Sequence, residues 1–484
     1  MPLAVLYLTN LGGAGFLGPD EPRYASIGRE MARSGDWITP RLDGMPWFEK
    51  PPLLYWMTAL GYRAHLPDEW AARLPVALAS LAFLIFFWAT IEREFSERVA
   101  LAATAMLATS AGWVAFSFVA VTDLPMSAAL GAAWLIALFD TRPHRGWVAG
   151  LLLGLAILAK GFVPVVLIAP VFLIARRKRL AMLVATVLTA APWYLLCSAR
   201  NGAAFWNDFF WKQHVERFLQ PTLEHVQPWW FFGFVLALGL FPWTPFLALL
   251  AMPKLFEDVR VRFLSVYFLF GFVFFTLSRN KLPGYLLPLM PALAIILAYA
   301  LNKVAGMTGG QESHLNTADS SRGPAWWITV GTLPLAAIPA IGRMLPDALL
   351  NGIRRVDFSF PGTFLGPAFG PTAAVAVPFL LASGVVFALA WSFRPQLAML
   401  LAALTAIVGI GYLKNSVLPT LDDRYSVRMF WLSNQPEARG ACLEGVRRDW
   451  EYGLNYYSGR RMEECGGAKG VRIEGRGGLK LEGR

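Results

Sequence analysis

The chain has 484 residues and a mass of 53.4 kDa, and 56% of its residues are hydrophobic while only 15% are charged. Soluble domains carry roughly 25% charged residues, so this composition excludes a soluble enzyme and a disordered chain and predicts a polytopic helical membrane protein. We interpret the net charge of +11 as loop charge at a membrane face, and we expect no nucleic-acid partner.

Thirteen apolar runs are candidate membrane spans, since a span needs roughly 17–25 apolar residues. In chain order they are 1–17, 72–91, 99–118, 124–139, 147–159, 162–175, 180–197, 229–251, 263–277, 285–301, 325–341, 372–392 and 396–413. The first run is short and contains Asn10 and three glycines. The runs 147–159 and 162–175 are either two short spans or one span interrupted at Lys160-Gly161.

The basic residues favour two spans at this point. With two spans and a cytoplasmic N-terminus, the tetrad 176–179 (Arg-Arg-Lys-Arg) lies inside, as basic loops usually do. The loops 18–71, 119–123, 198–228 and 278–284 then all lie on the outer face. These loops are rich in acidic, His, Trp and Pro residues, which predicts a shared site at that surface.

The predicted division of the chain is a transmembrane catalytic part, 1–413, and a small periplasmic tail, 414–484. In an oxidising compartment, Cys442 and Cys465 are expected to form a disulfide that closes part of the tail. Cys197, at the end of a span, is expected to be buried.

The first outer loop begins with a predicted helix. Asp20 and Glu21 precede Pro22, and Gly35 follows as a stop signal. Asp20 is the expected N-cap of this helix. A purely structural role as the N-cap is the alternative to a chemical role for Asp20. Tyr24, Ile27 and Met31 form an apolar stripe, so we expect an amphipathic helix that lies flat on the membrane surface.

A series of motifs in the first 301 residues resembles the lipid A 4-amino-4-deoxy-L-arabinose transferases and the wider bacterial relatives of the protein mannosyltransferases. The motifs are Asp20-Glu21-x-Arg23-Tyr24, Arg29-Glu30-Met31, Gly35-Asp36-Trp37, Pro40, Phe48-Glu49-Lys50-Pro51-Pro52, Thr122-Asp123, Leu158-Ala159-Lys160-Gly161, His214-Val215-Glu216-Arg217-Phe218, Gln227-Pro228-Trp229-Trp230, Phe241-Pro242-Trp243 and Lys281-Leu282-Pro283-Gly284-Tyr285. Beyond residue 301 the resemblance is much weaker.

The resemblance implies an inverting glycosyltransferase with the all-α GT-C fold. Such an enzyme takes a sugar from a polyprenyl phosphate and works at the outer face of the bacterial inner membrane. The implied donor is an undecaprenyl-phosphate sugar, with 4-amino-4-deoxy-L-arabinose as one candidate, and the implied acceptor is lipid A or another envelope molecule. Protein hydroxyl groups are a second acceptor class. A lipid-linked-sugar flippase is an alternative from a different class, but it predicts an inverted repeat that is not evident in the sequence.

The resemblance also implies roles for individual residues. Asp20 is the candidate catalytic acid group, which orients or deprotonates the acceptor. Phosphate binding is assigned to four side chains, which are Arg23, Lys50, Lys281 and Tyr285. The alternative interpretation is that the three cations lie at the membrane interface with their charged ends at the head groups. In that interpretation the tyrosine is an interface anchor.

Further side chains are expected to support the sugar, the acceptor or the site itself. They are Glu21, Glu49, Asp123, Lys160, His214 and Arg217. Lys160, between two apolar runs, predicts a partner acid or a water-filled cavity. No cofactor is required. A divalent cation at Glu49 and His225 stays an open alternative with little support, because the histidines show no metal-ligand spacing with Glu49.

Overall fold

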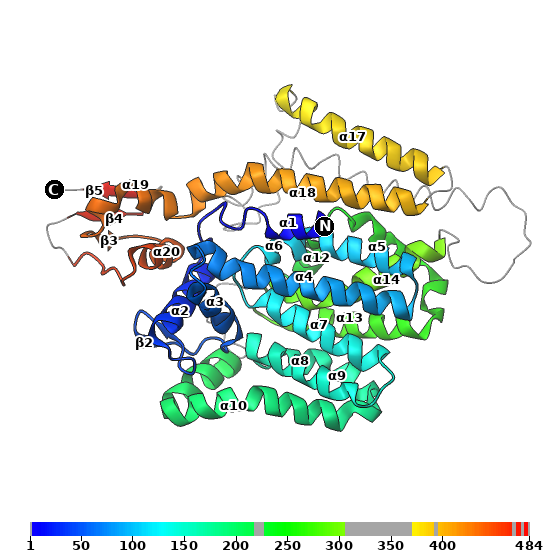
Figure 1. The fold of residues 1–484 in the computed structure, drawn as a ribbon, viewed down its shortest axis with the longest axis horizontal. Helices are drawn as coiled ribbons and strands as arrows, with labels where there is room; N and C mark the ends of the chain where they lie inside the picture. Colours follow the sequence, from blue (N-terminus) through cyan, green and yellow to red (C-terminus); the bar gives the residue numbers. More distant parts are fainter. Residues whose placement is uncertain are drawn as a thin grey trace, which may run out of the picture.

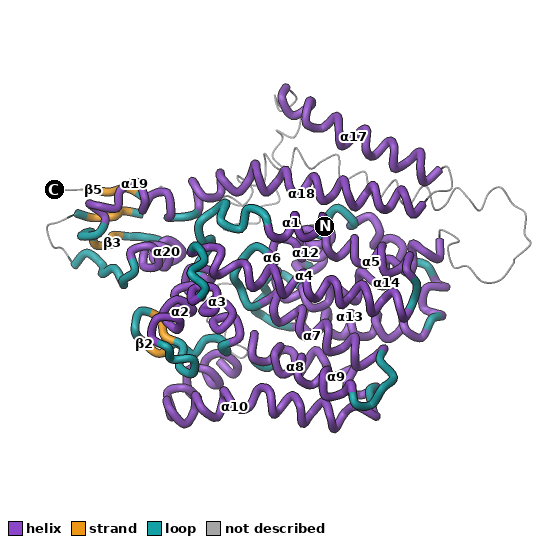
Figure 2. The backbone as a smooth tube through the Cα atoms, viewed as in Figure 1, coloured by secondary structure: helices purple, strands orange, loops and turns teal. Residues whose placement is uncertain are grey.

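The computed structural model describes residues 2–216, 227–304, 370–391, 395–466, 471–475 and 479–482. The predicted span 325–341 lies outside these ranges. Within them the chain is a bundle of helices, with a small sheet at one end (Figures 1 and 2).

The helices of the described residues are α1 (Pro2–Leu8), α2 (Asp20–Ser34), α3 (Leu53–Arg63), α4 (Asp68–Glu94), α5 (Glu97–Thr109), α6 (Ala111–Ser117), α7 (Asp123–Phe139), α8 (Arg145–Lys160), α9 (Val163–Ile174), η1 (Arg176–Lys178), α10 (Arg179–Phe205), η2 (Trp206–Glu216), α12 (Phe231–Leu240), η3 (Thr244–Ala251), η4 (Pro253–Glu257), α13 (Val259–Leu277), η5 (Pro283–Leu289), α14 (Met290–Val304), α17 (Gly370–Trp391), α18 (Pro395–Tyr425), α19 (Arg428–Ala438) and α20 (Arg448–Ser458). The strands are β1 (Arg41–Leu42), β2 (Met45–Pro46), β3 (Cys442–Glu444), β4 (Arg472–Glu474) and β5 (Lys480–Glu482). Strands β1 and β2 form a hairpin, whereas β4 pairs in parallel with β3 and antiparallel with β5.

The predicted all-α membrane class is confirmed, but the count of thirteen spans is not. Five helices of the described part are long and apolar enough to cross a membrane, or up to seven if each of two sharply bent helix pairs is one span. One bent pair is α5 with α6, at 60°, and the other is α12 with η3, at 115°. In the run 1–17 the helix α1 has only seven residues, which is too short to cross a bilayer.

The predicted break at Lys160-Gly161 is present. Helix α8 ends at Lys160 and α9 begins at Val163. Gly161 between them has a φ of 82°, a conformation that residues with a side chain rarely adopt. The two runs are therefore separate helices, and the break holds Lys160 at a helix end.

Helix α2 has the predicted bounds, but its apolar stripe is covered by protein. The stripe packs on α3, where Tyr24 and Tyr55 lie with ring centroids 5.8 Å apart. Gly28 permits this close approach, since a Cβ there would come within 1.9 Å of the Thr58 hydroxyl. The expectation of a helix that rests its stripe on the membrane surface is therefore replaced by a helix docked on its neighbour.

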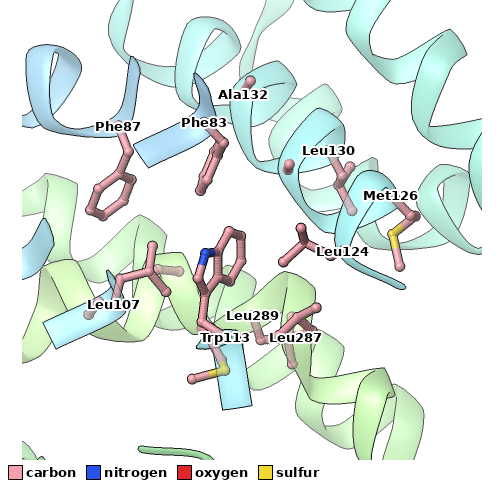
Figure 3. Packing of buried hydrophobic residues seen from close by; sticks show 14 of the residues in the cluster. Phe83, Phe87, Leu107, Trp113, Leu124, Met126, Leu130, Ala132, Leu287 and Leu289 are labelled. Atoms are coloured by element: carbon pink, nitrogen blue, oxygen red, sulfur yellow. The ribbon is translucent and has the colours of Figure 1, made fainter. Parts of the chain in front are cut away.

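Behind the first loop lies a continuous apolar core built from α4, α5, α6 and α7. Figure 3 shows Phe83 and Phe87 beside Trp113, with ring centroids of Phe83 and Trp113 5.3 Å apart. The Trp113 indole donates to the hydroxyl of Ser80 at 2.8 Å, so its polar atom is satisfied inside the core. This packing fixes the helix ends that carry the polar loops.

The C-terminal part stands at the same end of the bundle as α2 and α3 (Figure 1). Helix α18 runs past residue 413 to Tyr425, and α19, α20 and the sheet follow it. The predicted disulfide between Cys442 and Cys465 is confirmed, as is the burial of Cys197. The tail is thus a small folded unit that contacts α2.

Candidate functional site

Asp20 is the first residue of α2, and its carboxylate faces a cation rather than the helix end. Pro19 occupies the N-cap position and no side chain caps the helix there. The Asp20 carboxylate instead pairs with the Arg23 guanidinium, one turn further on. Its side chain is 48% exposed, so it remains accessible to a substrate. The expected N-cap role of Asp20 is therefore wrong.

Arg23 is the centre of a four-residue ion network. Its guanidinium is buried and lies 3.0 Å from the Glu49 carboxylate, which is itself 3.3 Å from the Lys50 ammonium. Burial alone lowers the Arg23 pKa, but Glu49, Tyr24 and Asp20 outweigh it and the pKa is raised. The charges of Asp20, Arg23, Glu49 and Lys50 sum to zero. A donor phosphate would therefore have to displace a carboxylate from one of the two cations.

Aromatic rings enclose the same guanidinium. The Arg23 Cζ lies 5.3 Å from the Tyr24 ring centroid and 5.4 Å from those of Trp47 and Tyr452. Tyr452 belongs to α20, so the tail contributes a wall of the site. Such rings stabilise a cation through its attraction to their negative faces.

Three buried donor atoms around Arg23 lack a hydrogen-bond partner among the described residues. They are Arg23 Nε, Trp47 Nε1 and the Tyr55 hydroxyl. Burial raises the pKa of Tyr55 well above its usual value, so this phenol keeps its proton and can donate it. Buried polar groups are normally paired, and unpaired ones are worth explaining. Donors of this kind suit an anionic or hydroxyl-rich ligand.

Glu21, predicted to support the sugar, the acceptor or the site itself, is engaged by other parts of the protein. Its carboxylate is fully buried and accepts two hydrogen bonds from Arg73, at 2.7 and 2.8 Å. It accepts two more from the backbone N–H groups of Leu17 and Ala120, both at 2.9 Å. Through four hydrogen bonds from three residues, Glu21 joins the start of α2 to α4 and to the loop before α7.

A second group of predicted residues meets at the break between α8 and α9. The Lys160 ammonium pairs with the Asp123 carboxylate and lies 5.0 Å from the Tyr285 ring centroid. The partner acid predicted for Lys160 is therefore Asp123, the first residue of α7. Gly284 allows the two segments to touch, since a Cβ there would lie 2.3 Å from Asp123 Oδ1.

This pair gives a testable coupling. We expect Asp123→Asn and Lys160→Gln each to lower stability and transfer activity, because each leaves a partly buried charge without its partner. The double variant should recover about 1–3 kcal/mol of the summed loss in the free energy of unfolding. Denaturant titration of the four proteins measures the coupling. Additive losses would show that the contact contributes nothing.

Lys281, another of the predicted phosphate-binding cations, contacts backbone carbonyls rather than carboxylates among the described residues. Its side chain is buried, and its ammonium donates to the backbone carbonyls of Ser278 at 2.7 Å and Gln227 at 3.2 Å. No carboxylate of the described residues lies within ion-pair distance of it. Its positive charge is therefore available to an anion.

Three predicted residues cannot be placed. The side chain of His214, on η2, and all of Arg217 and His225 lie outside the described part of the chain. In the part that is described, no group of three or more His, Cys, Asp or Glu residues could hold a metal ion. The cation alternative at Glu49 and His225 stays untested.

Sequence reasoning missed three contributors to the site. They are Arg73, which holds Glu21, Trp47, which borders Arg23, and Tyr452 from the tail. A charged residue inside the apolar run 72–91 is costly unless it has a partner, so the sequence could have indicated that Arg73 pairs with an acid. No local signal placed Tyr452 beside a residue more than 400 positions earlier.

The resemblance predicted from the motifs is confirmed by comparison with known proteins. A family model described as dolichyl-phosphate-mannose-protein mannosyltransferase matches residues 49–199. A Pseudomonas aeruginosa protein named undecaprenyl phosphate-alpha-4-amino-4-deoxy-L-arabinose arabinosyl transferase is 34% identical over 319 residues, 61% of this chain and 58% of that relative. A protein of the same name from Erwinia tasmaniensis is 29% identical over 94% of this chain and 86% of its own length.

The fold is also confirmed by a solved structure. The crystal structure of ArnT from Cupriavidus metallidurans bound to undecaprenyl phosphate superposes with a TM-score of 0.73 at 24% identity, and the match covers 96% of this chain and 85% of that one. Its apo structure superposes with a TM-score of 0.70. The chain therefore shares the GT-C fold of that structure.

Proposed function

We propose that this chain is an inverting membrane glycosyltransferase that moves a sugar from undecaprenyl phosphate to an envelope acceptor. The leading sugar is 4-amino-4-deoxy-L-arabinose, by analogy with the names of the relatives. Lipid A is the leading acceptor, as the motif resemblance implies. Residues 1–413 would form the catalytic membrane part and 414–484 an outer tail. The membrane would be the bacterial inner membrane, with the site on its periplasmic face.

The observation that carries the proposal is the juxtaposition at the start of α2. A half-exposed carboxylate, Asp20, lies against the buried guanidinium of Arg23. Arg23 Nε, Trp47 Nε1 and the Tyr55 hydroxyl have no hydrogen-bond partner among the described residues. An acid group beside a phosphate-binding cation is what sugar transfer from a lipid phosphate requires.

The proposed step breaks one bond and forms one. An acceptor oxygen attacks the anomeric carbon from the face opposite the lipid phosphate. The anomeric C–O bond breaks, and its electron pair leaves with undecaprenyl phosphate. Asp20 orients the acceptor, and it takes the proton when the acceptor is a hydroxyl group. If the acceptor is a phosphate of lipid A, the nucleophile is already an anion, and Asp20 acts by positioning.

Four residues would hold the donor phosphate. Lys281 supplies a cation that has no carboxylate partner among the described residues, and Tyr285 follows four residues later beside Lys160. Arg23 and Lys50 would exchange a carboxylate for the phosphate as the donor enters. Glu49 would then be released toward sugar hydroxyls or an amine.

A product assay in proteoliposomes tests the proposal. Purified protein is given undecaprenyl-phosphate sugars, including 4-amino-4-deoxy-L-arabinose, with lipid A or a serine-rich peptide as acceptor. We expect glycosylated lipid A, detected by mass spectrometry, and inverted anomeric configuration in the product. Transfer only to the peptide would favour the protein mannosyltransferase alternative. Donor movement across the bilayer without transfer to either acceptor would contradict the enzyme and favour a flippase.

A further inference from the structure

A cationic pocket lies between α2, the β1–β2 turn and the tail. Its volume is about 330 Å³. Four arginines and two acids line it, and they are Arg29, Arg33, Arg460, Arg461, Glu30 and Asp43. The pocket therefore has two positive charges in excess.

The four arginines of this pocket form no ion pair with Glu30 or Asp43 among the described residues. Arg29 donates to the Tyr456 carbonyl at 2.7 Å and stacks on that ring, while Arg460 donates to the Arg439 carbonyl at 2.6 Å. These partners are neutral. Arg33 and Arg461 form no hydrogen bond or ion pair with the described residues. Burial raises the pKa of Asp43, although Arg461 and Arg29 oppose that rise.

The pocket continues the face of α2 that carries the candidate site. Ser26, Glu30 and Arg33 follow Arg23 by three, seven and ten residues, the spacing of one helix face. At 1.5 Å per residue they lie about 5 to 15 Å along the axis from Arg23. On α20, Asn455 borders the pocket one turn after Tyr452, which walls the site.

We propose that this pocket binds the second phosphate of a bis-phosphorylated saccharide acceptor whose reacting end lies at Asp20. The inference rests on the proposed function and adds to it the class of acceptor and the residues that select it. Guanidinium groups match phosphate oxygens with paired hydrogen bonds, and an excess of two charges suits a phosphate monoester. The volume, at the lower end for ligand pockets, holds a phosphate and part of a sugar. A disaccharide with a phosphate at each end spans the distance along α2.

Acceptor kinetics with Arg33→Ala/Arg461→Ala test the assignment. We expect the KM for diphosphorylated lipid A to rise about 10- to 100-fold, because two charge-assisted contacts are lost. The kcat and the KM for the donor should stay the same. With monophosphorylated lipid A that keeps only the phosphate at the reacting end, the KM should change less than about twofold, since no second phosphate reaches the pocket.

Two further variants keep the test sharp. Arg176→Ala/Arg177→Ala removes two exposed arginines from η1 and controls for net charge; it should leave every KM unchanged. Asp43→Asn should have the opposite effect and lower the KM for the diphosphorylated acceptor, because it removes a carboxylate from the pocket. Asn tolerates the positive φ of 54° at this position, so the substitution is compatible with the turn.

Three outcomes would overturn the pocket assignment while leaving the proposed function intact. One is an equal KM change for both acceptors, and another is no change in any variant. The third is that inorganic phosphate alone raises the wild-type KM to that of the double variant, which would make this a general phosphate site. Failure of the wild type to transfer sugar at all would overturn the proposed function itself.

Discussion

Asp20→Asn is expected to lower kcat for sugar transfer to a hydroxyl acceptor by about 10²- to 10⁴-fold, the range for loss of a general acid–base group. For a phosphate acceptor, which Asp20 only positions, the expected loss is smaller. The substitution keeps the size and shape of the side chain but removes its charge and its ability to accept a proton. The fold should survive, because Asp20 is 48% exposed and Arg23 keeps Glu49 at 3.0 Å. Initial rates with lipid A and the sugar donor, together with thermal unfolding in detergent, measure both quantities.

The matched control for this prediction is Asp208→Asn. Asp208 is 45% exposed and pairs with Lys212 at 2.9 Å, so it resembles Asp20 in exposure and in having a basic partner one turn away. Its loss should change kcat by less than about twofold, as expected for a surface ion pair. A value of kcat for Asp20→Asn within about threefold of wild type would remove Asp20 from the catalytic role.

The largest loss of stability is expected from Arg73→Met. The substitution leaves the fully buried Glu21 carboxylate without its cation and frees the backbone carbonyls of Leu11, Ala14 and Gly15, to which Arg73 donates at 2.7 to 2.8 Å. Removing one partner of a buried pair costs about 3–5 kcal/mol. Denaturant unfolding in detergent measures the cost, and hydrogen exchange should show faster opening around Ala14.

Arg93→Met on the same helix is the control for Arg73→Met. Arg93 is 53% exposed and pairs with Glu94 at 2.9 Å, and exposed pairs contribute about 0–1 kcal/mol. Adding Glu21→Leu to Arg73→Met should restore much of the lost stability, since a paired apolar replacement removes the buried charge. Equal stabilities of the two single variants would show that the Glu21–Arg73 pair does not hold α2 in place.

Asp20 and Glu21 are adjacent in one motif but differ in burial and in the partners of their carboxylates. The two acids are neighbours in the sequence, yet one is half exposed beside Arg23 and the other is fully buried and accepts four hydrogen bonds. The sequence motif alone assigns both to the site. Their different burial favours Asp20 for the proposed chemistry and gives Glu21 a structural role.

Local features of the chain were determined by the sequence itself. The apolar composition predicted a helical membrane protein. The glycine signal predicted the end of α2, and the acid–proline signal predicted its start to within one residue. Gly161 predicted the break after Lys160, and the two tail cysteines predicted their disulfide. These features depend on composition, on helix periodicity or on a few neighbouring residues, so they can be read without knowing the fold.

The tertiary structure decided which distant groups meet. It paired Glu21 with Arg73, Lys160 with Asp123, and Arg29 with the Tyr456 carbonyl, which lies 427 residues away. It also covered the apolar stripe of α2 with α3 and placed the tail against the site. Periodicity states that a face is apolar or charged but not what covers it, because the partner is selected by packing and charge across the whole bundle.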